Sequence, residues 1–117
     1  MGTFFHPITL LSESGASATV EALVDTGSTF TTIPAATLEP LGVRPHRTVR
    51  LRLANGQVDE RRIGRIMAQL DGVQDEIICV FGGPEDVPTI GAHTLETFLL
   101  AVDPDGQRLV PVEGWWV

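Results

Sequence analysis

The chain has 117 residues, which is enough for one domain, and 43% of them are hydrophobic, which is enough for a core. Its net charge of -7 argues against general nucleic-acid binding, and no apolar run approaches the ~20 residues that span a bilayer. The N-terminus lacks the basic start and long apolar stretch of a signal peptide. We therefore expect one cytoplasmic domain over residues 1–117, without a nucleic-acid or membrane partner.

Apolar runs bounded by turn residues predict a series of short strands. These runs are residues 3–11, 19–25, 30–33, 49–53, 58–70, 76–81, 87–91, 100–102 and 108–110. Pro7 restricts the first strand to a sheet edge or a bulge. Asn55-Gly56, Asp71-Gly72 and the segment 103–106 favour hairpin turns between neighbouring strands.

Two segments favour helix. Pro34 suits the first position of a short helix over residues 35–39. Leu95, Phe98 and Leu99 share one face of a second helix over residues 92–99. Because short strands outnumber helices, the sequence predicts a mainly β, all-β fold, either a barrel or a sandwich.

The positive charges are concentrated in one segment. Residues 44–65 hold seven of the eight arginines and two acidic residues, so this segment carries +5 and the remainder of the chain carries -12. A solvated hairpin that complements an acidic body explains this pattern, and so does a basic rim that favours acidic partners or substrates. The sequence leaves both interpretations open.

The stretch Ala22–Ser28 places a carboxylate between a strand and a turn. The apolar residues before Asp25 favour a buried strand, and Thr26, Gly27 and Ser28 after it allow a sharp turn. An aspartate that only caps a turn would produce the same pattern. The Asp-Thr-Gly triplet taken alone does not distinguish these two roles.

Hydrolysis of a peptide bond requires a base that takes a proton from water and an acid that gives one to the carbonyl oxygen. Two carboxylates held within a few Å share one proton, so that one acts as the base and the other as the acid. The sequence contains Asp-Thr-Gly only once, at Asp25. A catalytic pair would therefore need a second copy of the chain, related by a two-fold axis through the Asp25 loops.

These residues resemble the motifs of the retropepsin-like aspartic proteases, in particular the small bacterial members related to retroviral proteases. Residues 23–28 look like the catalytic loop of that family, and Thr89-Ile90-Gly91 resembles its second motif, which precedes a helix. The hairpin tipped by Asn55-Gly56 lies where the family has a flap that closes over the substrate. The resemblance covers residues 4–112 and implies a closed acid-protease barrel with a flap hairpin and one short C-terminal helix.

The resemblance also implies roles for the site residues. Asp25 would activate water together with Asp25 of a second subunit, in a homodimer that cleaves peptides or proteins at acidic pH without a metal or cofactor. Thr26 would bond across the two-fold axis, Gly27 would let the substrate backbone approach, and Ser28 would donate a hydrogen bond to the carboxylate. The other implied site residues belong to the flap and to the second motif: Leu53, Ala54, Asn55, Gly56, Thr89, Ile90 and Gly91.

The sequence also departs from the retroviral pattern. Retroviral members have acidic residues after the loop and an arginine after the second glycine, whereas this chain has Thr29, Phe30 and Ala92. Substrate contacts at those positions therefore do not transfer. The flap tip is less glycine-rich, which predicts a stiffer flap. The side chains expected to contact substrate are Phe30, Leu53, Ala54 and Ile90.

Three further features bear on function. Cys79 is the only cysteine and lies in an apolar run, which favours a core residue over a nucleophile. The three histidines show no metal-ligand spacing. Trp115 and Trp116 either enter an interface with a second subunit or pack on the chain's own body.

Two other functions stay open. One is a catalytically silent module of the same fold that binds peptides or joins subunits. The other is a self-processing or regulatory fragment of a larger system. The intact Asp-Thr-Gly-Ser argues against a silent module, because a binding protein has little use for paired acids that repel each other.

Overall fold

The computed structural model describes residues 4–103 and 105–117. Its elements, in chain order, are β1 (Phe5–Leu11), β2 (Ser17–Val24), β3 (Thr31–Pro34), α1 (Ala35–Leu38), β4 (Arg47–Arg52), β5 (Val58–Leu70), β6 (Val73–Gly82), β7 (Thr89–Ile90), α2 (Ala92–Thr97), β8 (Leu100–Asp103) and β9 (Arg108–Pro111). Thr3 and Pro104, which the sequence assigns to a strand and a hairpin turn, lie outside the described residues. The prediction of a mainly β fold is confirmed.

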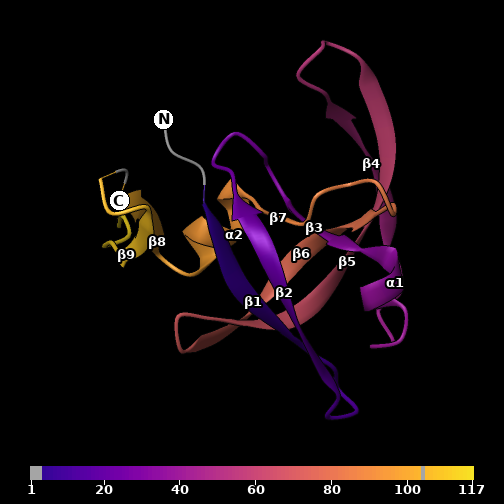
Figure 1. Ribbon diagram of the computed structural model, residues 1–117, viewed down its shortest axis with the longest axis horizontal. Coiled ribbons are helices and arrows are strands. Elements are labelled where there is room, and N and C mark those ends of the chain that lie inside the picture. The colour runs from indigo at the N-terminus through magenta and orange to yellow at the C-terminus, as the bar shows by residue number, and fades with distance from the viewer. Residues whose placement is uncertain (1–3, 104) are drawn as a thin grey trace.

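Seven strands form one strongly curved sheet (Figure 1). Their order is β1-β2-β7-β3-β6-β5-β4, and β1 also pairs with β5, which closes six of the strands into a ring. The β1–β5 ladder involves only Thr9, Leu10 and Leu11. Pro7 therefore lies where β1 pairs with β2 alone, as expected for a residue that cannot donate a hydrogen bond to a second neighbour.

The hairpin of β4 and the first half of β5 extends beyond the ring, at the upper right of Figure 1. Its turn is closed by the Leu53 N–H, which donates to the Gln57 carbonyl at 2.7 Å, and by the Gly56 N–H, which donates to the Leu53 carbonyl at 2.9 Å. Gly56 has φ +86°, a conformation that glycine adopts without strain. The predicted Asn55-Gly56 hairpin is confirmed.

Two predictions about the helix ends are wrong for identifiable reasons. The first helix begins at Ala35 as predicted, but Pro34 does not occupy its first position: it pairs with Gly82 as the last residue of β3, and its ψ of 134° keeps it extended. The second helix ends at Thr97 rather than at residue 99. Leu99 has φ +54°, which turns the chain and leaves its side chain 47% exposed instead of in the core.

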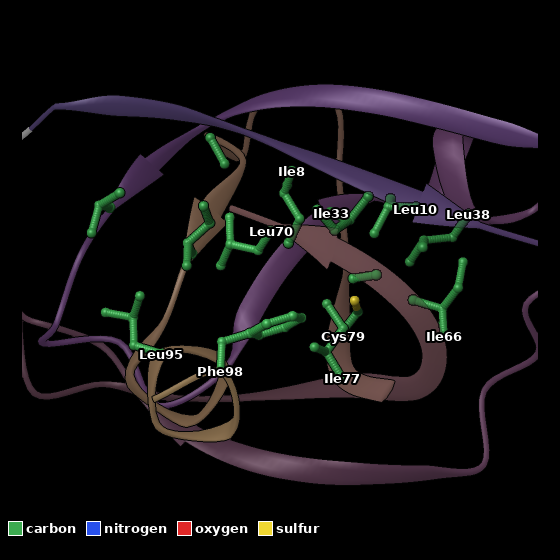
Figure 2. Close-up of a cluster of buried hydrophobic side chains, with 14 of the residues drawn as sticks. Ile8, Leu10, Ile33, Leu38, Ile66, Leu70, Ile77, Cys79, Leu95 and Phe98 are labelled. Carbon is green, nitrogen blue, oxygen red and sulfur yellow. The ribbon is translucent and has the colours of Figure 1, made fainter. Parts of the chain in front are cut away.

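The core fills the ring. Figure 2 shows Leu95 of α2 and Phe98, which follows this helix, at one end of the cluster and Leu38 and Ile66 at the other. Each fully buried Leu or Ile contributes about 1.5–3 kcal/mol by removing apolar surface from water. Cys79 is fully buried among these side chains, and burial raises the pKa of its thiol to about 12, which confirms its role as a core residue.

The C-terminal strands β8 and β9 form a separate two-stranded sheet on the side of the molecule away from the flap (Figure 1). The tail that follows is exposed, with 97% of Trp115 and 98% of Trp116 accessible to solvent. The interpretation that these tryptophans pack on the chain's own body is therefore wrong for the single chain. Within the described residues, no helix is long and apolar enough to cross a membrane.

Candidate active site

The Asp25 loop crosses the end of a neighbouring strand. β7 lies between β2 and β3, and it runs parallel to β2, so the loop that joins β2 to β3 must pass over the carboxyl end of β7. The Asp25 N–H donates to the Ile90 carbonyl at 3.0 Å, and the Ala92 and His93 N–H groups donate to the carbonyls of Ser28 and Thr29 at 2.7 and 2.9 Å. These bonds satisfy the first N–H groups of α2 and fix both ends of the loop.

Within the loop, the Asp25 carboxylate accepts two hydrogen bonds. The Gly27 N–H donates to Oδ1 at 2.9 Å, and the Ser28 hydroxyl is 3.4 Å from Oδ2. The first bond is a normal Asx turn, whereas the second is long for a hydroxyl donor. Ser28 thus lies beside the carboxylate as the sequence predicts, but its bond to the carboxylate is weak in the single chain.

Gly91 makes the crossing of loop and strand sterically feasible. A Cβ at this position would lie 2.4 Å from the Phe30 carbonyl oxygen and 2.8 Å from the Ser28 carbonyl oxygen. A Cβ atom essentially never lies this close to a non-bonded atom, so only glycine at position 91 lets the Asp25 loop pass over the end of β7. Gly91 of the second motif therefore packs directly against the backbone of the segment that follows Asp25.

A buried pair of threonines stabilises the same crossing of the Asp25 loop over β7. The sequence did not reveal this pair. Thr31 Oγ1 and Thr94 Oγ1 are 2.6 Å apart, both residues are 0% exposed, and the Gly91 N–H donates to Thr31 Oγ1 at 3.2 Å. These bonds tie the strand after the loop to α2 and to Gly91. The alternation of Thr31 with buried Ile33 was the available signal, since it placed both side chains on the inner face of β3.

The Asp25 loop and the flap line one cleft with a volume of about 830 Å³. Asp25, Gly27, Ser28, Leu53, Ala54 and Thr89 are the predicted site residues among its walls. Asn55 and Gly56 form the turn at the flap tip, and the exposed Thr26 lies on the outward side of the Asp25 loop. Further lining residues are Thr29, Phe30, Thr32, Arg50, Leu51, Arg52, Asp59, Arg61, Val80, Asp86 and Val87.

Of the four side chains expected to contact substrate, Phe30, Leu53 and Ala54 line the cleft. The expectation for Ile90 is wrong, because its side chain is 0% exposed and belongs to the core. Successive residues of a strand point to opposite faces, and Thr89, the preceding residue of β7, faces the cleft instead.

A charged cluster lies in the cleft wall. Arg61 donates from Nε to Asp59 Oδ2 at 2.9 Å and from Nη1 to Asp86 Oδ2 at 2.8 Å. The bond from Arg61, and after it the bond from the Gly83 N–H at 2.7 Å, lower the pKa of Asp86. The bonds to Asp86 and Asp59 raise the pKa of Arg61. No spacing rule marked Arg61 among the seven arginines of its segment; only its alternation with Ile63 indicated an inward side chain.

The residues described contain no group of three His, Cys, Asp or Glu arranged to hold a metal ion. His6 lies 3.6 Å from Asp71, and the ring of His93 lies 6.0 Å from that of Phe30.

Comparisons with known proteins agree with this geometry. The family model described as "Aspartyl protease" matches residues 6–72, which is more than half of the chain and includes the Asp25 loop and the flap. A search of curated proteins gave no match.

Several solved structures share the fold at low sequence identity. A retropepsin-like aspartic protease from Rickettsia conorii is 19% identical, with a TM-score of 0.55 and 89% of each chain covered. The simian foamy virus (mac) protease is 20% identical, with a TM-score of 0.53, covering 77% of this chain and 91% of the viral one. The EIAV protease, solved with the inhibitor HBY-793, is 14% identical, with a TM-score of 0.55 and 93% of each chain covered. The chain therefore belongs to the aspartyl protease family and has a retropepsin-like fold.

Proposed function

We propose that this protein is an aspartic endopeptidase that acts as a homodimer, with one Asp25 contributed by each subunit. The observation that carries the proposal is the Asp25 carboxylate itself. It lies at a cleft covered by a hairpin, it is held by its own loop, and no second carboxylate of an Asp-Thr-Gly loop exists in the chain.

The surroundings of Asp25 suit a half-site. The backbone of the loop is fixed to β7 and α2, whereas Thr26 and Gly27 are exposed. A two-fold axis through two such loops would bring the carboxylates together and cover the exposed residues. One exposed loop thus supplies both half of the chemistry and part of the contact between subunits.

In the proposed reaction, one carboxylate of the pair is ionised and the other is protonated. The ionised carboxylate takes a proton from a water molecule, whose oxygen attacks the peptide carbonyl carbon. The protonated carboxyl gives its proton to the carbonyl oxygen. The tetrahedral gem-diol intermediate then breaks at the C–N bond: the carboxyl that took the proton from water gives it to the amide nitrogen, and the other, now ionised, carboxylate takes a proton from one hydroxyl of the diol. An amine and a carboxylic acid are released, and the pair again holds one proton. No step requires a metal or a redox cofactor.

The test is cleavage of a peptide library between pH 3 and 8 by the wild type and by Asp25→Asn. Removing the ionisable group should lower the rate by about 10³-fold or more, because acid–base catalysis of this size is lost. Asp75→Asn, which removes an exposed carboxylate on β6, is the matched control and should leave the rate unchanged. Equal rates in the wild type and Asp25→Asn would end the protease proposal and favour a catalytically silent peptide-binding module.

The mass of the active species tests the second half of the proposal. Sedimentation at the assay concentration should show a dimer, and the specific activity should fall on dilution as the dimer dissociates. An active monomer would exclude a shared site. A rate that still rises above pH 7 would contradict the requirement for one proton per carboxylate pair.

A further inference from the structure

Arg61 lines the same cleft as Asp25 and bonds to two separate parts of the cleft wall. It belongs to β5 within the flap hairpin, opposite Val49 of β4. Asp59 and Ile63 share its face of the strand, since residues two apart point the same way. Arg61 and Asp59 line the cleft and Ile63 is 0% exposed, so this face of the hairpin is turned toward the cleft.

The guanidinium of Arg61 bridges two separate parts of the chain. Its Nε bonds Asp59 within the flap at 2.9 Å, and its Nη1 bonds Asp86 in the loop after β6 at 2.8 Å. A planar guanidinium fixes the directions of both bonds at once, which the single ammonium of a lysine does not. The flap strand and the loop are therefore held in one relative orientation.

The loop that receives this bond leads directly to the support of Asp25. Asp86 closes its own turn, because its Oδ2 accepts from the Gly83 N–H at 2.7 Å and its N–H donates to the Gly83 carbonyl at 3.1 Å. Two residues later, the Pro88 carbonyl accepts from the Leu23 N–H at 2.8 Å, in the strand that delivers Asp25. A continuous set of bonds thus runs from the flap to the catalytic strand.

The bridge contributes to position more than to stability. The side chains of Arg61, Asp59 and Asp86 are 31%, 45% and 36% exposed, and ion pairs exposed to this extent add little to the free energy of unfolding. The lowered pKa of Asp86 keeps its carboxylate charged into the acidic range, so the bridge persists where an aspartic peptidase works.

We propose that Arg61 is a positioning residue, which holds the flap against the loop 83–88 so that both walls of the cleft keep a fixed spacing around the substrate. This inference rests on the proposed peptidase function. Ala54 on the flap hairpin and Val87 in the loop 83–88 both line the cleft, and they are the side chains whose separation the bridge would set.

The experiment compares full-length wild type with Arg61→Met, Arg61→Lys, Asp86→Asn and the double variant Arg61→Met/Asp86→Asn. We expect Arg61→Met to lower kcat/KM by about tenfold, mainly through kcat, because misplaced walls reduce productive alignment of the bound peptide. Arg61→Lys should recover part of the loss. The double variant should lose no more than Arg61→Met alone, since both changes break the same bridge.

Arg65→Met is the matched control. Arg65 lies on the same strand and pairs with Glu76 at 3.6 Å, outside the residues that line the cleft. Its removal should leave kcat and KM unchanged. Amide hydrogen exchange of the same proteins should be faster in the flap and in residues 83–88 of Arg61→Met, and unchanged in Arg65→Met.

The outcomes separate this inference from the proposed function. If the wild type cleaves peptides and Arg61→Met has the same kcat and KM, the positioning role is wrong and the peptidase stands. If Arg61→Met and Asp86→Asn lose activity additively, the two residues act separately and the bridge is again wrong. If even the wild type cleaves nothing, the proposed function fails, and unchanged exchange in Arg61→Met would then overturn the bridge as well.

Discussion

The Asp25 loop and the flap tip are both short turns that line the same cleft, but they are held in opposite ways. The Asp25 loop bonds to residues more than sixty positions away, at Ile90, Ala92 and His93. Among the residues that the structure describes, the flap tip makes hydrogen bonds only within itself, between residues 52 and 57. Opening the flap tip therefore breaks none of the long-range hydrogen bonds seen in the described part of the chain, whereas moving Asp25 breaks bonds to β7 and α2. The proposed chemistry would require a fixed carboxylate, and entry of a peptide substrate would require a cover that opens; the two turns differ accordingly.

Gly91→Ala tests most directly whether the Asp25 loop is held in a fixed position, because the added methyl group would displace the loop. The added methyl would lie 2.4 Å from the Phe30 carbonyl oxygen, so the loop must shift. We expect a loss of about 3 kcal/mol or more in stability and no measurable peptidase activity. Urea unfolding and the peptide assay measure the two effects.

Gly83→Ala is the control for Gly91→Ala. Its Cβ would meet Asp86 Oδ2 at 3.5 Å, which is an ordinary contact. It should change stability by less than about 1 kcal/mol. Equal effects of the two substitutions would show that the close passage over Gly91 is not what holds the loop.

The buried threonine pair offers a smaller change at the same support. Thr31→Val removes one hydroxyl of the pair 2.6 Å apart and leaves Thr94 and the Gly91 N–H without a buried partner. The expected cost is about 2 kcal/mol, with a lower kcat. Thr9→Val is the matched control, because Thr9 and Thr19 make a similar bond of 2.9 Å at the surface, and it should cost less than about 0.5 kcal/mol.

Gly91 and the threonine pair also show which parts of the candidate site could be predicted from the sequence. Gly91 and the role of Asp25 were predictable because family motifs contain them, and the turn at Asp25 and the Asn55-Gly56 hairpin were predictable from local turn chemistry. Thr31, Thr94, Arg61 and Asp86 were not, because each acts through a partner 25 or more residues away. Local patterns predict strands and turns, while such pairings depend on the register between distant strands. The prediction at Pro34 failed because pairing with the distant strand β6 holds this residue in β3, and the one at Leu99 failed because a positive φ turns the chain there.

Deletion of the C-terminal tail tests whether its two tryptophans contribute to a dimer in which a second chain supplies the other Asp25. Trp115 and Trp116 are almost fully exposed, and a tryptophan buries about 150–250 Å² when it enters an interface. Deleting residues 114–117 should raise the dimer dissociation constant at least about tenfold, which is about 1.4 kcal/mol. Sedimentation measures the constant.

The truncation should leave the fold of each chain intact, because the Val112 N–H keeps its bond to the Leu99 carbonyl at 2.9 Å. The melting temperature of the monomer serves as the control. Activity should recover at high protein concentration, where the weakened dimer forms again. An unchanged dissociation constant would remove the tail from the interface.

The smallest expected effect concerns the ionic bond between Arg61 of the flap hairpin and Asp86 of the loop 83–88. The pKa of Asp86 is lowered, first by Arg61 and then by the Gly83 N–H. A lowered pKa in the folded state stabilises the fold above the ordinary carboxyl value of about 3.9 and loses this effect as the pH falls through the lowered value. Asp86→Asn should therefore cost about 0.5 kcal/mol of stability at pH 6, a small amount because the side chain is 36% exposed, and progressively less below pH 4.

Urea unfolding at several pH values measures the difference in stability between the wild type and Asp86→Asn. The same substitution made in Arg61→Met should cost less, since the largest cause of the shift is then absent. A cost that stays constant down to pH 2, or that grows as the pH falls, would mean that the charge of Asp86 does not hold the flap to the cleft wall.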